Sequence, residues 1–215
     1  MVSRISSHSF LIASFIILFL YFDLIFSYVT SFPHSHILSL SSSLSLFFPL
    51  SPSLFLSLSS VTGLCEGLES NFLTLAESTR DTLLKLMLTC LQDSFPELRQ
   101  SAFALTGDLC KSCVQFISPV APQLVEIILR NLDFEYPMVC NNASWTVGEL
   151  AIKVGGAAMS PYITRLMHSF IQILHEKDIP TTLTENVAIT VGRLGVTNTA
   201  QLADYLSEYL EVWCM

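Results

Sequence analysis

Cys110 and Cys113 form a C-x-x-C, the spacing in this sequence closest to a chemical motif. Such a pair binds zinc when further ligands follow, and it exchanges disulfides when a βαβ unit surrounds it. No second pair follows here, no histidine lies nearby in sequence, and no βαβ pattern is present. We therefore predict no zinc or redox site, and expect the six cysteines to be buried thiols in a reducing compartment.

Other residues with possible chemistry also lack the partners they would need. His168 and His175 have no cysteine or carboxylate at ligand spacing, so we expect no metal site. Asn142-Ala-Ser144 matches a glycosylation acceptor, but it falls inside a predicted helix of a cytosolic protein, where it should be silent. Phosphate-binding loops, nucleophile elbows and catalytic carboxylate pairs are not found in the sequence. The sequence thus favours a binding protein without cofactors over an enzyme.

An internal repeat in the sequence predicts the helices that carry these residues. Residues 96–109, 137–150 and 181–194 align at spacings of 41 and 44 residues, and each block ends in Gly-x-Leu. Apolar residues at helical spacing between the blocks predict partner helices over 82–91, 122–132, 162–174 and 202–212. A period of about 40 to 47 residues with two helices is typical of HEAT and armadillo repeats. We predict an all-α HEAT-repeat α-α solenoid of about three to four repeats, without strands.

Local signals refine the element ends. Pro96 and Pro137 suit the first position of a helix, and Asp93 or Ser94 can cap the first block. Val61 to Leu68 reads as the last turns of a further inner helix. Neither end of the repeat region 61–215 has the sequence of a polar capping repeat, so we expect apolar surface at both of its ends.

A helical wheel separates two faces of each block. In the second block the core stripe points about 160° away from Trp145, at about 100° per residue; it comprises Val139, Ala143, Val147, Leu150 and Val154. Trp145 and Ile189 occupy equivalent positions of successive repeats on the opposite face. These two side chains are predicted to flank one groove, in which the indole would hold an apolar or basic peptide. The alternative is that Trp145 packs between adjacent repeats.

The first sixty residues have a different composition. Leu11 to Phe26 is an apolar run that imitates a signal peptide or a short membrane anchor, although Asp23 interrupts it. Every residue from Leu38 to Ser60 is Leu, Ser, Phe or Pro, whose codons can all begin with two pyrimidines. We interpret residues 1–60 as a non-globular segment translated from intron, with a targeting segment or a disordered tail as alternatives, and residues 61–215 as the solenoid.

Charge narrows the class of partner. Residues 1–60 carry one basic and one acidic residue, so the net charge of -8 belongs to residues 61–215. An acidic domain is unsuited to nucleic acid but suited to a basic peptide.

Three segments resemble the C-terminal half of transportin, the importin-beta-2 type karyopherin: 94–105, 140–149 and 183–195. The resemblance implies a nuclear import receptor of cytoplasm and nucleus that binds cargo proteins through basic proline-tyrosine nuclear localisation signals. It assigns cargo contacts to Trp145, Ile189, Pro180 and Asn141. It also implies that the site for the GTPase Ran lies in repeats absent here. The sequence departs from the family at Pro137, where an aliphatic residue is usual.

Acidic residues near these positions complete the predicted site. Glu185 joins the cargo-binding set, and an acidic rim for a basic signal is expected from Glu149, Glu185, Glu135, Asp133 and Asp178. A solvated helix surface explains the same residues equally well. The alternative function is a HEAT-repeat scaffold of another complex.

Overall fold

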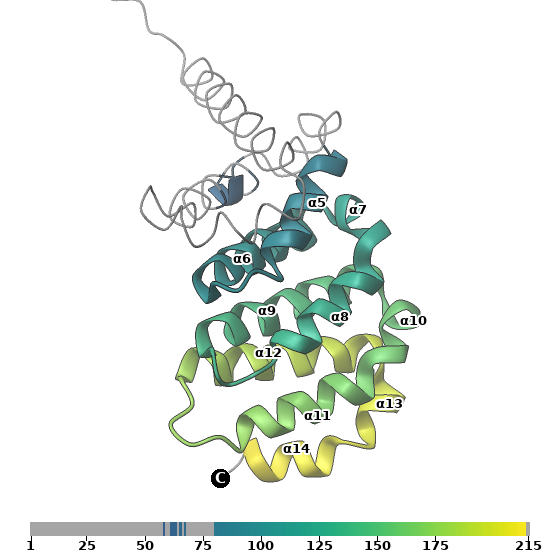
Figure 1. Cartoon of the computed structure of the whole chain (residues 1–215). Coiled ribbons are helices and arrows are strands. Elements are labelled where there is room, and N and C mark those ends of the chain that lie inside the picture. The colour runs from purple at the N-terminus through teal and green to yellow at the C-terminus, as the bar shows by residue number, and fades with distance from the viewer. Residues whose placement is uncertain (1–57, 59–60, 64, 66, 68–79, 214–215) are drawn as a thin grey trace, which may run out of the picture. The chain divides into compact units, whose positions relative to one another are not determined.

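The computed structural model describes residues 58, 61–63, 65, 67 and 80–213, which belong to one compact unit, Leu54–Met215. Every regular element among these residues is helical, and the longer helices form two rows (Figure 1). The inner row consists of α6 (Pro96–Ser112), α9 (Pro137–Val154) and α12 (Thr181–Thr197). The outer row consists of α5 (Arg80–Cys90), α8 (Ala121–Asn131), α11 (Ile163–Leu174) and α14 (Leu206–Trp213). The predicted all-α solenoid of helix pairs is confirmed.

The inner helices begin where the repeat placed them. Pro96 and Pro137 occupy the first turn of α6 and α9, where a missing N–H costs no hydrogen bond. The predicted capping by Asp93 or Ser94 is wrong, because Phe95 is the N-cap of α6 and has no side-chain cap. Asp93 instead accepts a hydrogen bond from the Phe95 N–H at 2.9 Å, which closes the preceding turn. The residue before a proline prefers extended backbone, and Phe95 adopts it.

Short helices follow each inner helix and return the chain to the outer row. They are α7 (Val114–Ile117) with the 3-10 turn η3 (Ser118–Val120), α10 (Gly156–Met159) with η4 (Ser160–Tyr162), and α13 (Thr199–Ala203). Ser160 and Pro161 lie in η4, and α11 begins at Ile163, one residue after the start expected at residue 162. Gly155 leaves α9 with φ 82°, a conformation that side chains disfavour.

The predicted helix over 202–212 is divided into α13 and α14 by a turn at Asp204 and Tyr205. At this break the Tyr205 hydroxyl donates to Thr164 Oγ1 at 2.8 Å. The Tyr205 ring also meets the His168 ring edge-on, with 5.5 Å between centroids. Contacts of Tyr205 with α11 therefore accompany the break between α13 and α14. The apolar periodicity of the sequence does not predict these contacts.

The core lies between the two rows. Leu150 is 0 % exposed, as are Leu124 of α8 and Phe170 of α11 on the outer side. The predicted stripe of α9 is buried apart from Val154, which is partly exposed. The corresponding residues of α12 are buried as well: Leu183, Val187, Val191 and Leu194. The inward-facing side of each inner helix is therefore the side that the apolar spacing indicated.

Buried hydroxyl groups join successive inner helices at equivalent positions. Thr146 Oγ1 donates to the Phe103 carbonyl at 2.9 Å, and Thr190 Oγ1 donates to the Ser144 carbonyl at 2.8 Å. Thr146 and Thr190 are equivalent residues of consecutive repeats, and so are Phe103 and Ser144. The same bond at both junctions sets one register for the whole inner row.

The N-terminal prediction concerns residues that the structure mostly does not describe. Residues 1–60, including the run Leu11 to Phe26, lie outside the described residues except for Leu58. The described residues between 58 and 67 are helical, and the Thr62 hydroxyl donates to the Leu58 carbonyl at 3.1 Å. The boundary expected at residue 61 stays a prediction.

Within the described part of the chain, no single helix has the length and apolar character needed to cross a membrane. The helices Pro96–Ser112 and Val114–Asn131 have that length and apolar character only when they are taken together, and the chain bends by 118° between them.

Candidate functional site

Trp145 lies on α9 with its ring against the neighbouring repeat. A Cβ added at Gly107 of α6 would overlap the six-membered ring of Trp145, so the ring rests on the bare backbone there. Its Nε1–H donates to Glu149 Oε1 at 3.1 Å. The indole nevertheless stays partly exposed. One portion of the ring therefore packs between repeats, as the alternative interpretation expected, and another portion faces solvent. Contact of Trp145 with a peptide stays a prediction.

Ile189 lies on α12 and is 50 % exposed. The hydrogen bond from Thr190 to the Ser144 carbonyl joins the residue after Ile189 to the residue before Trp145. This bond joins the segments that carry Trp145 and Ile189 at the α9–α12 junction, and the two residues occupy equivalent positions of successive repeats.

The exposed apolar surface continues beyond this pair. Ile152, two turns after Trp145, is 43 % exposed, and Val196, two turns after Ile189, is 77 % exposed. Trp145, Ile152, Ile189 and Val196 together form what we call the Trp145 face. It points away from the core stripe, whose member Val147 is 0 % exposed. This face could contact an extended apolar segment laid across α9 and α12.

The remaining predicted contacts lie beside or beyond this face. Asn141 Oδ1 accepts a hydrogen bond from Asn186 Nδ2 at 2.9 Å, so this side chain also helps to join α9 to α12. Glu185 is exposed one turn before Ile189 on α12. Pro180 is the N-cap of α12 and is partly buried. It lies about 13 Å along the helix axis from Ile189, since each residue rises 1.5 Å, which places it at the edge of the inner row.

Glu149 has a different role from the acidic rim expected of it. Its side chain is 11 % exposed, and its Oε1 atom lies 2.8 Å from Arg193 Nη2 of the next repeat. Because the carboxylate is already shared by Arg193 and the Trp145 indole, it offers no free charge to a ligand. Among the other proposed rim residues, Glu185, Glu135, Asp133 and Asp178 are exposed.

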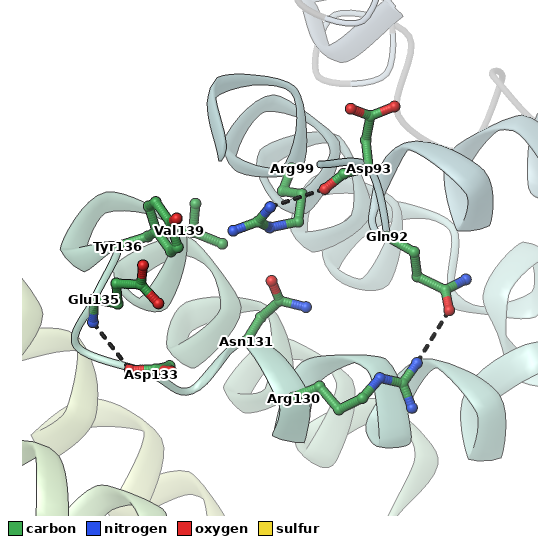
Figure 2. A pocket seen from close by; sticks show the side chains of 9 residues that line it. All are labelled: Gln92, Asp93, Arg99, Arg130, Asn131, Asp133, Glu135, Tyr136 and Val139. Carbon is green, nitrogen blue, oxygen red and sulfur yellow. Dashed lines mark hydrogen bonds between the residues drawn. The ribbon is translucent and has the colours of Figure 1, made fainter. Parts of the chain in front are cut away.

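Two of these acidic residues line a separate pocket of about 400 Å³ (Figure 2). It is formed by the α5–α6 and α8–α9 connections and by the ends of the helices beside them. The Arg99 guanidinium donates to the Asp93 carbonyl at 2.8 Å and stacks 5.0 Å from the centre of the Tyr136 ring. Arg130 donates to Gln92 Oε1 at 3.1 Å. The cations of this pocket are therefore engaged in joining neighbouring repeats, and Trp145 is not among its lining residues.

The five described cysteines are buried, as predicted: Cys65, Cys90, Cys110, Cys113 and Cys140. Burial raises the pKa of Cys90 and of Cys140 to about 12. Burial also raises the pKa of Cys110 and Cys113 above the usual thiol range. These groups stay protonated at neutral pH, and thiolates are the reactive and metal-binding form. No group of three or more potential metal ligands gathers among the described residues.

The solenoid and its tryptophan-bearing helix match known proteins. Transportin-1 of Homo sapiens is 42% identical over 154 residues, which cover 72% of this chain and 17% of that protein. The importin subunit beta-2 of Schizosaccharomyces pombe is 36% identical over 155 residues, 71% of this chain and 17% of that protein. The chain belongs to the transportin, or importin-beta-2, family. It spans about 17% of the length of these relatives, and no protein-family model matches it.

Solved structures agree on the fold of this transportin-type segment. Kap121p bound to Pho4p superposes with a TM-score of 0.63 at 14% identity, covering 74% of this chain and 15% of that one. A designed armadillo repeat protein in complex with the peptide (KR)4 gives a TM-score of 0.59 at 15% identity, over 78% of this chain and 66% of that one. At these identities the match concerns the helical solenoid alone.

Sequence patterns do not identify two residues that support the Trp145 ring, Gly107 and Arg193. In the sequence, Gly107 is only the first residue of the repeated Gly-x-Leu ending. Asp108, Glu149 and Arg193 occupy equivalent positions of the three blocks. Glu149 and Arg193 have opposite charges at the same position of consecutive repeats. This pattern was the sequence signal that could have predicted an ion pair between the repeats.

Proposed function

We propose that the Trp145 face binds the apolar or basic portion of a proline-tyrosine nuclear localisation signal, as part of a nuclear import receptor shuttling between cytoplasm and nucleus. The observation that carries this proposal is the partly exposed Trp145 and the exposed Ile189 at equivalent positions of adjacent inner helices. An indole with a free portion offers both apolar area and a surface for cations. Family membership supports the same role.

The charge of the chain favours a basic ligand. Residues 61–215 carry the whole net charge of -8, and Glu185 is exposed one turn from Ile189. A designed armadillo repeat protein of similar fold holds a peptide of alternating lysine and arginine. Electrostatic attraction of this kind raises the association rate and is weakened by salt.

A binding assay on the full chain tests the proposal. The anisotropy of a labelled basic proline-tyrosine signal peptide is titrated with the unsubstituted chain and with Trp145→Ala. Loss of a tryptophan at a binding hot spot costs about 2 kcal/mol or more, so we expect affinity to fall by about 30-fold. Because Trp145 also covers Gly107, Trp145→Phe serves as the milder variant, since it keeps an aromatic ring at this position.

The matched control truncates an exposed apolar side chain away from this face. Leu210 of α14 is 43 % exposed in the outer row, and Leu210→Ala should leave the affinity unchanged. Absence of binding by the unsubstituted chain would favour the alternative, a HEAT-repeat scaffold. An equal loss in Trp145→Ala and Leu210→Ala would show that the effect reflects folding rather than contact.

A further inference from the structure

Gly107 is the point on which the Trp145 ring rests. Gly107 itself is buried, and any side chain there would occupy the space of the ring. The other two glycines of the repeated Gly-x-Leu ending differ from it. A Cβ at Gly148 would meet Thr190 and Arg193, whereas Gly192 has nothing within 4 Å of the same position. Among these three glycines, only Gly107 therefore lies against the indole.

The far end of the indole is held by a chain of polar contacts. The Trp145 N–H donates to Glu149 at 3.1 Å, and the same oxygen of Glu149 lies 2.8 Å from Arg193 on α12. Glu149 is 9 % exposed, so water screens this pair poorly. Trp145 is thus supported on one side by α6 and tied on the other to α12, across three consecutive repeats.

We infer that Gly107, Glu149 and Arg193 are positioning residues that hold the Trp145 ring in one orientation for peptide binding. This inference rests on the proposed function of the Trp145 face. A side chain that is immobilised before binding loses less conformational freedom when the ligand arrives. The three residues need no contact with the peptide, because their effect passes through the indole.

A spectroscopic test follows the indole directly. The chain has two tryptophans, so Trp213→Phe leaves Trp145 as the only indole emitter. In this background Gly107→Ala should raise acrylamide quenching of Trp145 fluorescence. It should also lower the affinity for the signal peptide by about tenfold or more. Gly192→Ala adds the same methyl group at the equivalent open position, away from the indole, and should leave the quenching unchanged. Far-UV circular dichroism checks that both variants fold.

A second pair of variants covers the case in which Gly107→Ala does not fold. Glu149→Ala removes the acceptor of the indole N–H and should raise quenching and weaken binding. Glu149→Gln keeps an oxygen acceptor, and it should restore most of the quenching protection and affinity lost in Glu149→Ala.

Outcomes separate the inference from the proposed function. Binding that is abolished by Trp145→Ala but unchanged in folded Gly107→Ala and Glu149→Ala would overturn the positioning role alone. Quenching that is equal in Gly107→Ala and Gly192→Ala would also overturn it. A failure of the unsubstituted chain to bind the peptide would overturn the proposed function, and the binding role of these residues with it.

Discussion

Leu150 should carry a large share of local stability and none of the peptide contact. Its side chain is 0 % exposed on α9, between the inner and outer rows. Leu150→Ala removes three buried carbons, worth about 2.4 kcal/mol at about 0.8 kcal/mol each. The cavity left behind adds to this, so we expect a loss of about 3 to 5 kcal/mol in the free energy of unfolding.

The matched control lies two residues away on the same helix. Ile152→Ala also removes three side-chain carbons, but Ile152 is 43 % exposed on the Trp145 face. It should cost less than about 1 kcal/mol, since little area leaves the protein interior.

Urea titration and thermal unfolding of the full chain measure both variants. For a chain of this size each kcal/mol shifts the thermal midpoint by about 2 to 4 °C. Leu150→Ala should therefore lower the midpoint by about 6 to 20 °C and Ile152→Ala by a few degrees at most. Equal shifts for the two variants would refute the assignment of the core stripe and the burial argument together.

Two further predictions concern the junctions and the thiols. Thr190→Val keeps the side-chain shape but removes the hydrogen bond to the Ser144 carbonyl, and should cost about 0.5 to 1.5 kcal/mol in urea titration. The exposed Thr199 hydroxyl donates to the Gly195 carbonyl of its own repeat, so Thr199→Val should lower the free energy of unfolding by less than about 0.5 kcal/mol. Equal losses in Thr190→Val and Thr199→Val would argue against a junction role for Thr190. The raised pKa of Cys140, about 12, leaves on the order of one thiolate in ten thousand at pH 8, so iodoacetamide should label it slowly in the native chain and rapidly in urea. Peptide mass spectrometry measures this labelling, and fast native modification of Cys140 would contradict its burial.

Much of the fold could be predicted from the sequence because solenoid contacts are local. Each inner helix buries a stripe against its own partner and its two neighbours, so the spacing of Val147 and Leu150 already reports the buried side. Repetition at 41 and 44 residues then assigns equivalent positions, which gave Trp145 and Ile189 the same position on successive inner helices. The proline positions and the first residues of α6, α9 and α12 followed from the same repeat, whereas each helix ends three or four residues beyond its block.

Several features depended on contacts that no single-sequence pattern records. The break between α13 and α14 accompanies Tyr205 contacts with Thr164 and His168, more than 35 residues away in sequence. The N-cap of α6 fell on Phe95 because a proline follows it, although Asp93 had the better capping chemistry.

Apolar periodicity and internal repetition by themselves determined that this chain forms an α-α solenoid, and that Trp145 and Ile189 share the face opposite the core. The tertiary structure decided how the Trp145 ring lies on that face. It rests on Gly107 from the preceding repeat and is tied through Glu149 to Arg193 of the following one. The physical reason is range: a helical stripe is encoded within about four residues, whereas the support of one side chain depends on the spacing and register of three packed helices.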